Sequence, residues 1–304
     1  MNKHNDKSIL SSDVEQVVQP FFLSTQERLQ QRSVAEVRVL SYRDDIVLDR
    51  PDHLATEEPL EIRVKGPGQE SVNIAVTMRT PGHDSELTVG FLFTEGLVRS
   101  RDEVVSVEAD ALFWNGQPCN TATVTLSQSF DLTSLKRNFY ATSSCGICGK
   151  ASLEQIAVHC APVAHGPFLS RSVLMTLPSR LRQSQPIFEQ TGGLHASGLF
   201  DAAGQLLSLR EDVGRHNAVD KLIGQMFLQG DTPLAEHILL VSGRFSFEIM
   251  QKAAMARIPI VCAVSAPSSL AVEAAKRFRM TLVGFLRDQS FNVYSHPERI
   301  ALGS

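Results

Sequence analysis

Three short apolar runs in the last third of the chain constrain its fold most. Ile238–Val241, Ile260–Val264 and Thr281–Phe285 begin 22 and then 21 residues apart. The spacers between them carry helix-forming residues that follow Ser246 and Ser268. Strands that are apolar throughout and alternate with helices are typical of a parallel sheet covered on both faces. The sequence therefore predicts a βαβαβ arrangement and an α/β domain here.

The preceding part of the chain has a different hydrophobic pattern. Val37–Leu40, Leu60–Val64 and Val72–Val76 alternate in the way expected of half-buried antiparallel strands. Asp84 is expected to cap a helix, and Asn115-Gly116 predicts the turn of a hairpin. The predicted fold class is α/β with an α+β N-terminal part. Its divisions are a loosely ordered extension (1–35), a smaller strand-rich N-terminal domain (36–140) and an α/β domain (141–304).

Between the N-terminal strands and the predicted βαβαβ part, hydrophobic periodicity predicts further helices and strands. Helices are expected over Leu177–Phe188 and Arg215–Leu228. A pair of strands, Leu194–Phe200 and Gln205–Arg210, is expected between them.

Composition excludes several classes of protein. Of the 304 residues, 43% are hydrophobic and 20% charged, which is enough apolar surface for a core and excludes a mainly disordered chain. The net charge of −4 argues against a protein that coats nucleic acid. No apolar run approaches the roughly 18 residues of a membrane helix. The polar N-terminus lacks a signal peptide, so the sequence predicts a cytoplasmic protein that binds neither nucleic acid nor membrane.

The five cysteines do not form a disulfide framework, because their number is odd and their distribution sparse. Cys119, Cys160 and Cys262 stand alone among apolar or turn residues and are expected to be buried as small apolar side chains. Cys145 and Cys148 form a C-x-x-C pair that needs another explanation.

The C-x-x-C pair lies between glycines and just before a predicted helix. Gly146 and Gly149 permit the tight turn that brings Cys145 and Cys148 together. A helix N-terminus lowers the pKa of a nearby thiol, which favours a nucleophilic thiolate. A structural zinc site, a thioredoxin-type dithiol and an inert turn remain alternatives, although zinc normally takes a second cysteine pair that is missing here.

Two further groups of residues suggest a ligand site. Gly192–Gly198 and Arg210–Asn217 supply His195 and His216, which either hold a ligand and relay protons or merely cap a helix. The order of motifs argues against zinc deaminase chemistry, because Ser197 stands where a glutamate is required.

The ends of the three predicted parallel strands form the other group. They are Ser242-Gly243-Arg244, Ser265–Ser269 and Phe285–Ser290. Ligands of open α/β sheets bind beyond the carboxyl ends of strands, and small turns before helices leave N–H groups free for phosphate. These turns predict an anionic ligand such as a nucleotide, with ordinary turn chemistry as the alternative.

Together these segments resemble the FdhD family of sulfurtransferase accessory proteins that formate dehydrogenase requires. The resemblance runs from about Pro59 to Glu298. Its motifs are Met78–Gly82 with Gly90–Gly96, Ser144–Gly149, Gly193–His195, Glu211–Asn217, and Leu282–Phe285 leading to Val293-Tyr294.

The resemblance implies a sulfurtransferase without a metal site of its own. Cys145 would carry a persulfide received from a cysteine desulfurase, and Cys148 would support the transfer. The acceptor would be the molybdenum cofactor, bis-molybdopterin guanine dinucleotide (Mo-bis-MGD), for which a guanine nucleotide would serve as a surrogate. Its contacts would be Phe285, Leu286, Arg287, Asp288, Gln289 and Ser290.

The resemblance also implies a cytidine-deaminase-like C-terminal domain and formate dehydrogenase as the client. A homodimer remains open. The alternative function is a chaperone that binds the molybdenum cofactor without transferring sulfur.

Overall fold

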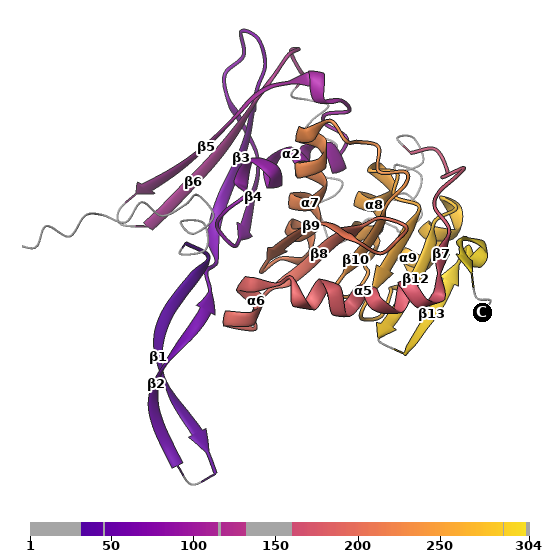
Figure 1. The fold of residues 1–304 in the computed structure, drawn as a ribbon. Coiled ribbons are helices and arrows are strands. Elements are labelled where there is room, and N and C mark those ends of the chain that lie inside the picture. The colour runs from indigo at the N-terminus through magenta and orange to yellow at the C-terminus, as the bar shows by residue number, and fades with distance from the viewer. Residues whose placement is uncertain (1–31, 45, 115–116, 132–159, 288, 302–304) are drawn as a thin grey trace, which may run out of the picture.

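The computed structural model describes residues 32–44, 46–114, 117–131, 160–287 and 289–301, without the side chains of 111–119. Figure 1 traces three parts: a two-stranded arm, a four-stranded sheet and a larger mixed sheet with helices on both faces. Cys145, Cys148 and Asp288 lie outside the described residues, as do the predicted turn at Asn115-Gly116 and the 140/141 domain boundary.

The arm pairs β1 (Val34–Arg43) with β2 (Ile46–Ala55) antiparallel along all ten residues of each strand. It projects away from the rest of the molecule (Figure 1). The strand predicted at Val37–Leu40 is thus confirmed, but it begins within the segment expected to be loosely ordered. Strand β2 lacks a buried face, so alternation gave no signal for it.

The four-stranded sheet has the order β4-β3-β6-β5, in which β3 and β6 are parallel. Alternate residues of its strands, such as Leu60, Ile62 and Val64, are buried, because one face packs against α2. The predicted strands and hairpin are confirmed in this sheet. Its elements are β3 (Glu58–Lys65), β4 (Val72–Arg79), α2 (Asp84–Thr94), the 3₁₀ turn η1 (Arg101–Glu103), β5 (Val104–Trp114) and β6 (Gln117–Leu126).

The larger sheet has the order β13-β12-β11-β10-β8-β9. The three strands β10, β11 and β12 are parallel, which confirms the βαβαβ prediction. Antiparallel β8 and β13 flank them, so the whole sheet is mixed. Its strands are β8 (His195–Phe200), β9 (Leu206–Asp212), β10 (Ile238–Val241), β11 (Ile260–Ala263), β12 (Thr281–Arg287) and β13 (Ser290–Ser295).

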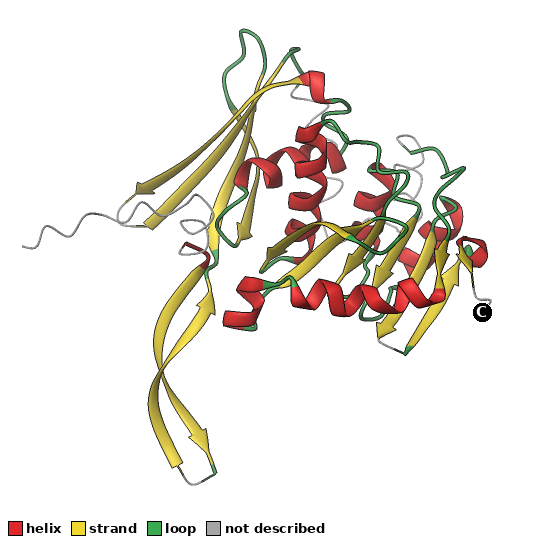
Figure 2. Ribbon diagram, in the orientation of Figure 1, coloured by secondary structure: helices red, strands yellow, loops and turns green. Residues whose placement is uncertain are grey.

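Helices cover both faces of this sheet (Figure 2). On one face, Leu174, Leu177 and Leu181 of α5 (Arg171–Gln183) pack on alternate strand residues. The other face is covered by α7 (Arg215–Gln229), α8 (Phe247–Met255) and α9 (Ser269–Arg277). The short strands β7 (Leu169–Ser170) and β14 (Ile300–Ala301) pair beside it, with the 3₁₀ turn η2 (Pro297–Arg299) before β14.

Two details of the predicted helices are wrong. The helix expected over 177–188 is two helices, because α5 ends at Gln183 and α6 (Pro186–Thr191) starts anew at a proline. Asp84 does not cap α2; the N-cap residue is His83, and the carboxylate of Asp84 instead binds Arg79. An ion pair with Arg79, five residues earlier in the chain, thus replaces the capping bond.

One hydrophobic core joins the two sheets, because residues from β3, α2, α7 and β11 share a single cluster. Cys160 and Cys262 are buried, as expected; the side chain of Cys119 is not described. In the part of the chain that the structure describes, no helix has both the length and the apolar character needed to cross a bilayer.

Candidate functional site

The carboxyl edge of the large sheet forms a continuous, hydrogen-bonded rim. The Ser242 amide donates to the Ala196 carbonyl at 2.9 Å, which ties the end of β10 to β8. The Phe245 amide donates to the Ala266 carbonyl, and the Phe285 amide to the Ser265 carbonyl, both at 3.1 Å. These bonds link the start of β8, the turns after β10 and β11, and the last residues of β12 into one ordered edge, which we call the rim.

The rim also collects the second predicted group of residues. Strand β8 runs antiparallel to both β10 and β9, so β9 ends at the same edge as β10. His195 begins β8, and Asp212 ends β9 directly before α7. The sheet therefore brings the histidine motifs and the strand-end turns, which are separate in the sequence, to one edge.

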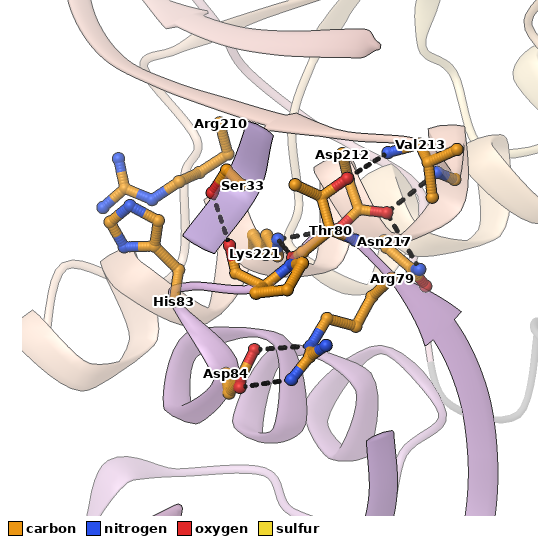
Figure 3. Close-up of polar contacts among 12 residues, drawn as sticks. Ser33, Arg79, Thr80, His83, Asp84, Arg210, Asp212, Val213, Asn217 and Lys221 are labelled. Atoms are coloured by element: carbon orange, nitrogen blue, oxygen red, sulfur yellow. Dashed lines mark hydrogen bonds and ion pairs between the residues drawn. The ribbon is translucent and has the colours of Figure 1, made fainter. Parts of the chain in front are cut away.

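A buried polar network fixes the start of α7 (Figure 3). Both carboxylate oxygens of Asp212 are used: Oδ1 accepts from Gly214 N (2.8 Å) and Asn217 Nδ2 (3.1 Å), and Oδ2 from Thr80 N (3.2 Å). Lys221 Nζ lies 2.7 Å from Oδ2, with both side chains buried. Asp212 therefore has a structural role and holds the entrance of α7 against the N-terminal sheet.

The network continues into the segment after β4. Lys221 Nζ donates to the Thr80 carbonyl at 2.8 Å, and Thr80 Oγ1 accepts from Val213 N at 3.2 Å. Asn217 Nδ2 also donates to the Met78 carbonyl at 2.7 Å. The sequence does not predict these contacts, because more than 130 residues separate the two segments and no local signal links them.

Two bidentate ion pairs support the same junction. Arg79, fully buried, binds both oxygens of Asp84 at 2.8 Å. Arg210 binds both oxygens of Glu86, which also lies 3.3 Å from His83 Nδ1. Burial by itself raises the pKa of Glu86, but the hydrogen bonds and charges of Arg210 and His83 together outweigh it and lower this pKa to about 2.

The two predicted histidines both lie near Arg215 at the rim. A Cβ built on Gly243 would lie 3.2 Å from His195 Nδ1 and 3.9 Å from Arg215 Cβ, so all three are in close proximity. His216 Nε2 is 3.3 Å from Ser246 Oγ, at the start of α8.

The surroundings of these histidines favour their neutral form. Burial and the charge of Arg215 lower the pKa of His216 to about 4. Burial, Arg215 and Arg244 also lower the pKa of His195, against the opposing charge of Asp212. Both imidazoles are therefore uncharged at neutral pH and able to accept or donate a hydrogen bond.

Phe285 has an unusual backbone conformation at the end of β12. Its φ is 51°, in the left-handed region that non-glycine residues seldom adopt, and the register with β13 shifts between Gly284 and Arg287. Bulges of this kind redirect a strand next to functional sites. Phe285 is 38% exposed at the rim.

The other residues of the predicted cofactor contact differ in accessibility. Arg287, Gln289 and Ser290 are exposed at the β12–β13 connection. Leu286 is fully buried on the α5 side of the sheet, so only its backbone is available to a ligand.

The chain enters and leaves the C-x-x-C segment at two anchored points. On the N-terminal side, Gln69 exchanges hydrogen bonds with the backbone of Phe130 at 2.9 and 3.0 Å. On the C-terminal side, Cys160 Sγ lies 3.1 Å from Sδ of Met255, the last residue of α8. Because α8 starts at the rim, Cys160 lies at its opposite end.

The two cysteines whose side chains are described are poor nucleophiles. Burial raises the pKa of Cys160 to about 11 and the pKa of Cys262 further still. Their thiols therefore stay protonated at neutral pH.

Comparisons with known proteins all indicate the same family for this chain. The chain matches the FdhD/NarQ family over residues 55–301. It is 48% identical to the sulfur carrier protein FdhD of Streptomyces coelicolor over 273 residues (87% of this chain, 95% of that protein). It is 46% identical to that of Mycobacterium tuberculosis over 277 residues (88% and 99%). A crystal structure of a candidate formate dehydrogenase accessory protein from Desulfotalea psychrophila superimposes with a TM-score of 0.66 at 25% identity, covering 88% of this chain and 99% of that one.

Proposed function

The chain belongs to the FdhD/NarQ family, and on that premise we propose that it is a sulfur carrier that serves formate dehydrogenase. It receives persulfide sulfur from a cysteine desulfurase on Cys145 and delivers it to the molybdenum cofactor, which is the substrate of the transfer. The observation that carries this proposal is the extended match to sulfur carrier proteins at 46–48% identity.

The chemistry of the cysteines supports Cys145 as the carrier. A persulfide acceptor must be a thiolate, and the raised pKa values of Cys160 and Cys262 make both unsuitable. The C-x-x-C pair, with its flanking glycines, meets the requirement best. Cys148 is placed by the same motif to assist.

The loading step is a thiol–persulfide exchange. The Cys145 thiolate attacks the outer sulfur of the desulfurase persulfide, a new S–S bond forms at Cys145 Sγ, and the desulfurase cysteine leaves as its thiolate. No electrons are gained or lost overall. Cys145 thus carries the sulfur at the same oxidation level as the desulfurase persulfide.

The rim is the proposed place for the guanine-nucleotide end of the cofactor. Phe285, Arg287, Gln289 and Ser290 offer an exposed ring and polar groups there, and Leu286 offers its backbone. Asp288 completes the predicted contact. Turns that lead into α8 and α9 add helix N-termini, which favour phosphate.

Sulfur and cofactor must meet even though Cys160 lies at the end of α8 away from the rim. Residues 132–159 comprise 159 − 132 + 1 = 28 residues. At about 3.3 Å per extended residue, this length far exceeds the roughly 14 Å of α8. The chain length therefore allows Cys145 to reach either end of the helix.

The predictions about partners, compartment and domain type extend this proposal. The desulfurase and formate dehydrogenase are the proposed partners, and the cytoplasm is the proposed compartment. We also retain the proposal of a cytidine-deaminase-like C-terminal domain, to which the mixed β9-β8-β10-β11-β12 order lends support.

Mass spectrometry after incubation with desulfurase and cysteine tests the function. We expect a sulfur adduct on the peptide containing Cys145, its loss in Cys145→Ala, and its retention in the matched control Cys160→Ala. Full labelling of Cys145→Ala would refute the carrier assignment. If Cys145→Ala with Cys148→Ala still matured formate dehydrogenase fully, the cofactor-binding chaperone would be the better description.

A further inference from the structure

The chain that leaves the C-x-x-C segment crosses the amino edge of the large sheet, which is the edge opposite the rim. We call residues 160–168 the exit segment. Cys160 belongs to the core on the α8 side of the sheet, and Leu169, directly after the exit segment, belongs to the core on the α5 side. Between them, the Val163 amide donates to the carbonyl of Phe278, which follows α9, at 2.9 Å. The exit segment therefore passes over the starts of the parallel strands.

Two arginines occupy equivalent positions at this amino edge. Arg257 follows the C-cap residue of α8, and Arg279 follows that of α9. Their φ values of 62° and 57° lie in the left-handed region, which glycine adopts with the least strain after a helix. Because Ile260 pairs with Thr281, the turns that lead into β11 and β12 lie side by side. Both turns thus carry a positive charge where glycine would be the easier residue.

A third arginine lies beside these turns. Arg299 is only 6% exposed, and its Nη1 donates to Oγ1 of Thr281, the first residue of β12, at 3.3 Å. A Cβ built on Gly166 would lie 3.3 Å from Arg299 Nε, so the exit segment passes directly over this side chain. In the part of the chain that the structure describes, none of the three arginines forms an ion pair, and the neighbouring Glu298 binds His296 instead, at 2.9 Å.

The exit segment adds an exposed aromatic side chain to this edge. Phe168 is 74% exposed, the highest value among the large apolar side chains that the structure describes. Ala161, Pro162 and Ala164 of the same segment are also exposed. Aromatic and arginine side chains are the residues that contribute most to protein–protein interfaces, and arginine pairs with carboxylates through two parallel N–H donors. The composition of this edge therefore indicates a docking surface for another protein.

We propose that the amino edge docks the cysteine desulfurase, with Phe168 as the apolar anchor and Arg257 and Arg279 facing acidic side chains of the desulfurase. This assignment rests on the proposed function. The unpaired groups are all cations, so the partner surface that fits them is acidic. The segment that carries Cys145 joins this surface at Cys160, which brings a docked sulfur donor next to the end of the carrier segment. The rim, the proposed place of the cofactor, stays accessible at the opposite edge.

Association with purified cysteine desulfurase, measured by surface plasmon resonance, tests the charges. We expect Arg257→Glu with Arg279→Glu to lower the association rate constant about tenfold at low salt, because opposite charges steer association. The difference should shrink at high salt, where exposed charges are screened. Arg257→Lys with Arg279→Lys keeps the charge and should keep the rate. In the matched control Arg43→Glu, an exposed arginine at the end of the arm (Figure 1), the rate stays unchanged.

A second variant tests the apolar anchor. We expect Phe168→Ser to weaken the equilibrium affinity for the desulfurase about tenfold, mainly through faster dissociation, as for the loss of an interface hot spot. Phe168→Leu retains an apolar group and should lose less. The matched control Tyr42→Ser removes an aromatic side chain that is 72% exposed on the arm and should leave the affinity unchanged.

Sulfur loading of Cys145 in the same variants, followed by mass spectrometry, separates this surface from the proposed function. Loading that slows in parallel with association supports both. Wild-type association and a normal adduct in the glutamate and Phe168→Ser variants would overturn the surface and leave the carrier function intact. Binding through these residues without any adduct on Cys145 would keep the surface and refute the carrier. If the variants lose affinity for formate dehydrogenase and not for the desulfurase, the proposal is wrong and the surface belongs to the client.

Discussion

Replacing Gly224 of α7 with alanine should destabilise the protein, although alanine is the better helix former. Helices α2 and α7 cross where Gly90 faces Gly224. A Cβ at position 224 would overlap the carbonyl oxygen of Glu86 and lie 2.8 Å from both Glu86 C and Gly90 N. These atoms belong to a helix backbone and cannot turn aside, so the two helices must separate.

The magnitude follows from two opposing effects. Gly→Ala within a helix gains about 1 kcal/mol of helix propensity. Overpacking a close contact costs about 3 kcal/mol, at the upper end of its usual range, because only rigid backbone faces the new methyl group. The expected net loss is about 2 kcal/mol in the free energy of unfolding.

Urea unfolding followed by far-ultraviolet circular dichroism measures this loss. Gly230→Ala is the matched control: it has open space and a φ of 83°, so it should lose only the roughly 1 kcal/mol of left-handed strain. Gly90→Ala with Gly224→Ala should cost less than the sum of the single changes, because either one already separates the helices. Stabilisation of Gly224→Ala by about 1 kcal/mol would refute the close crossing.

Three other predictions concern the junction and the rim. Lys221→Met leaves the Asp212 carboxylate buried without its cation and should cost about 3 to 5 kcal/mol in urea unfolding; a loss under about 1 kcal/mol would contradict the structural role of the pair. The folded-state pKa of Glu86, about 2 against 4.5, means that the stability it contributes is present above pH 4.5 and is lost as the pH falls toward 2. That loss is about 3 kcal/mol, and Arg210→Met should abolish most of it, whereas an equal acid loss in the variant would exclude this ion pair as the cause. Phe285→Gly relieves the left-handed backbone and should leave the unfolding free energy within about 1 kcal/mol of the wild type while weakening guanosine diphosphate binding in calorimetry; unchanged binding would exclude the ring from the site.

The local sequence pattern was sufficient to predict most helices and strands but not their boundaries. The strands β10, β11 and β12 were predictable because each is a short apolar run and helix signals separate one from the next. The boundary between α5 and α6 was missed because the apolar periodicity continues across Pro186. Strand β2 was missed because its residues bury no common face, so their alternation carries no information.

The candidate site shows the same division. The two histidine motifs and the strand-end turns could each be identified from their residues, yet their meeting at one rim depends on β8 and β9 pairing beside β10. The same holds for Arg215, whose Nε is buried without a hydrogen-bond acceptor among the residues that the structure describes.

By itself the sequence determined the periodic elements, the parallel order of β10, β11 and β12, and the thiol and anion chemistry expected of its motifs, since each depends on residues close together in the chain. Only the tertiary structure decided that Asp212 belongs to Lys221 and Thr80 and that α2 crosses α7 at two glycines. Such pairings depend on which distant surfaces are buried against each other, and burial, rather than sequence spacing, determines the cost of leaving a charge or donor unpaired.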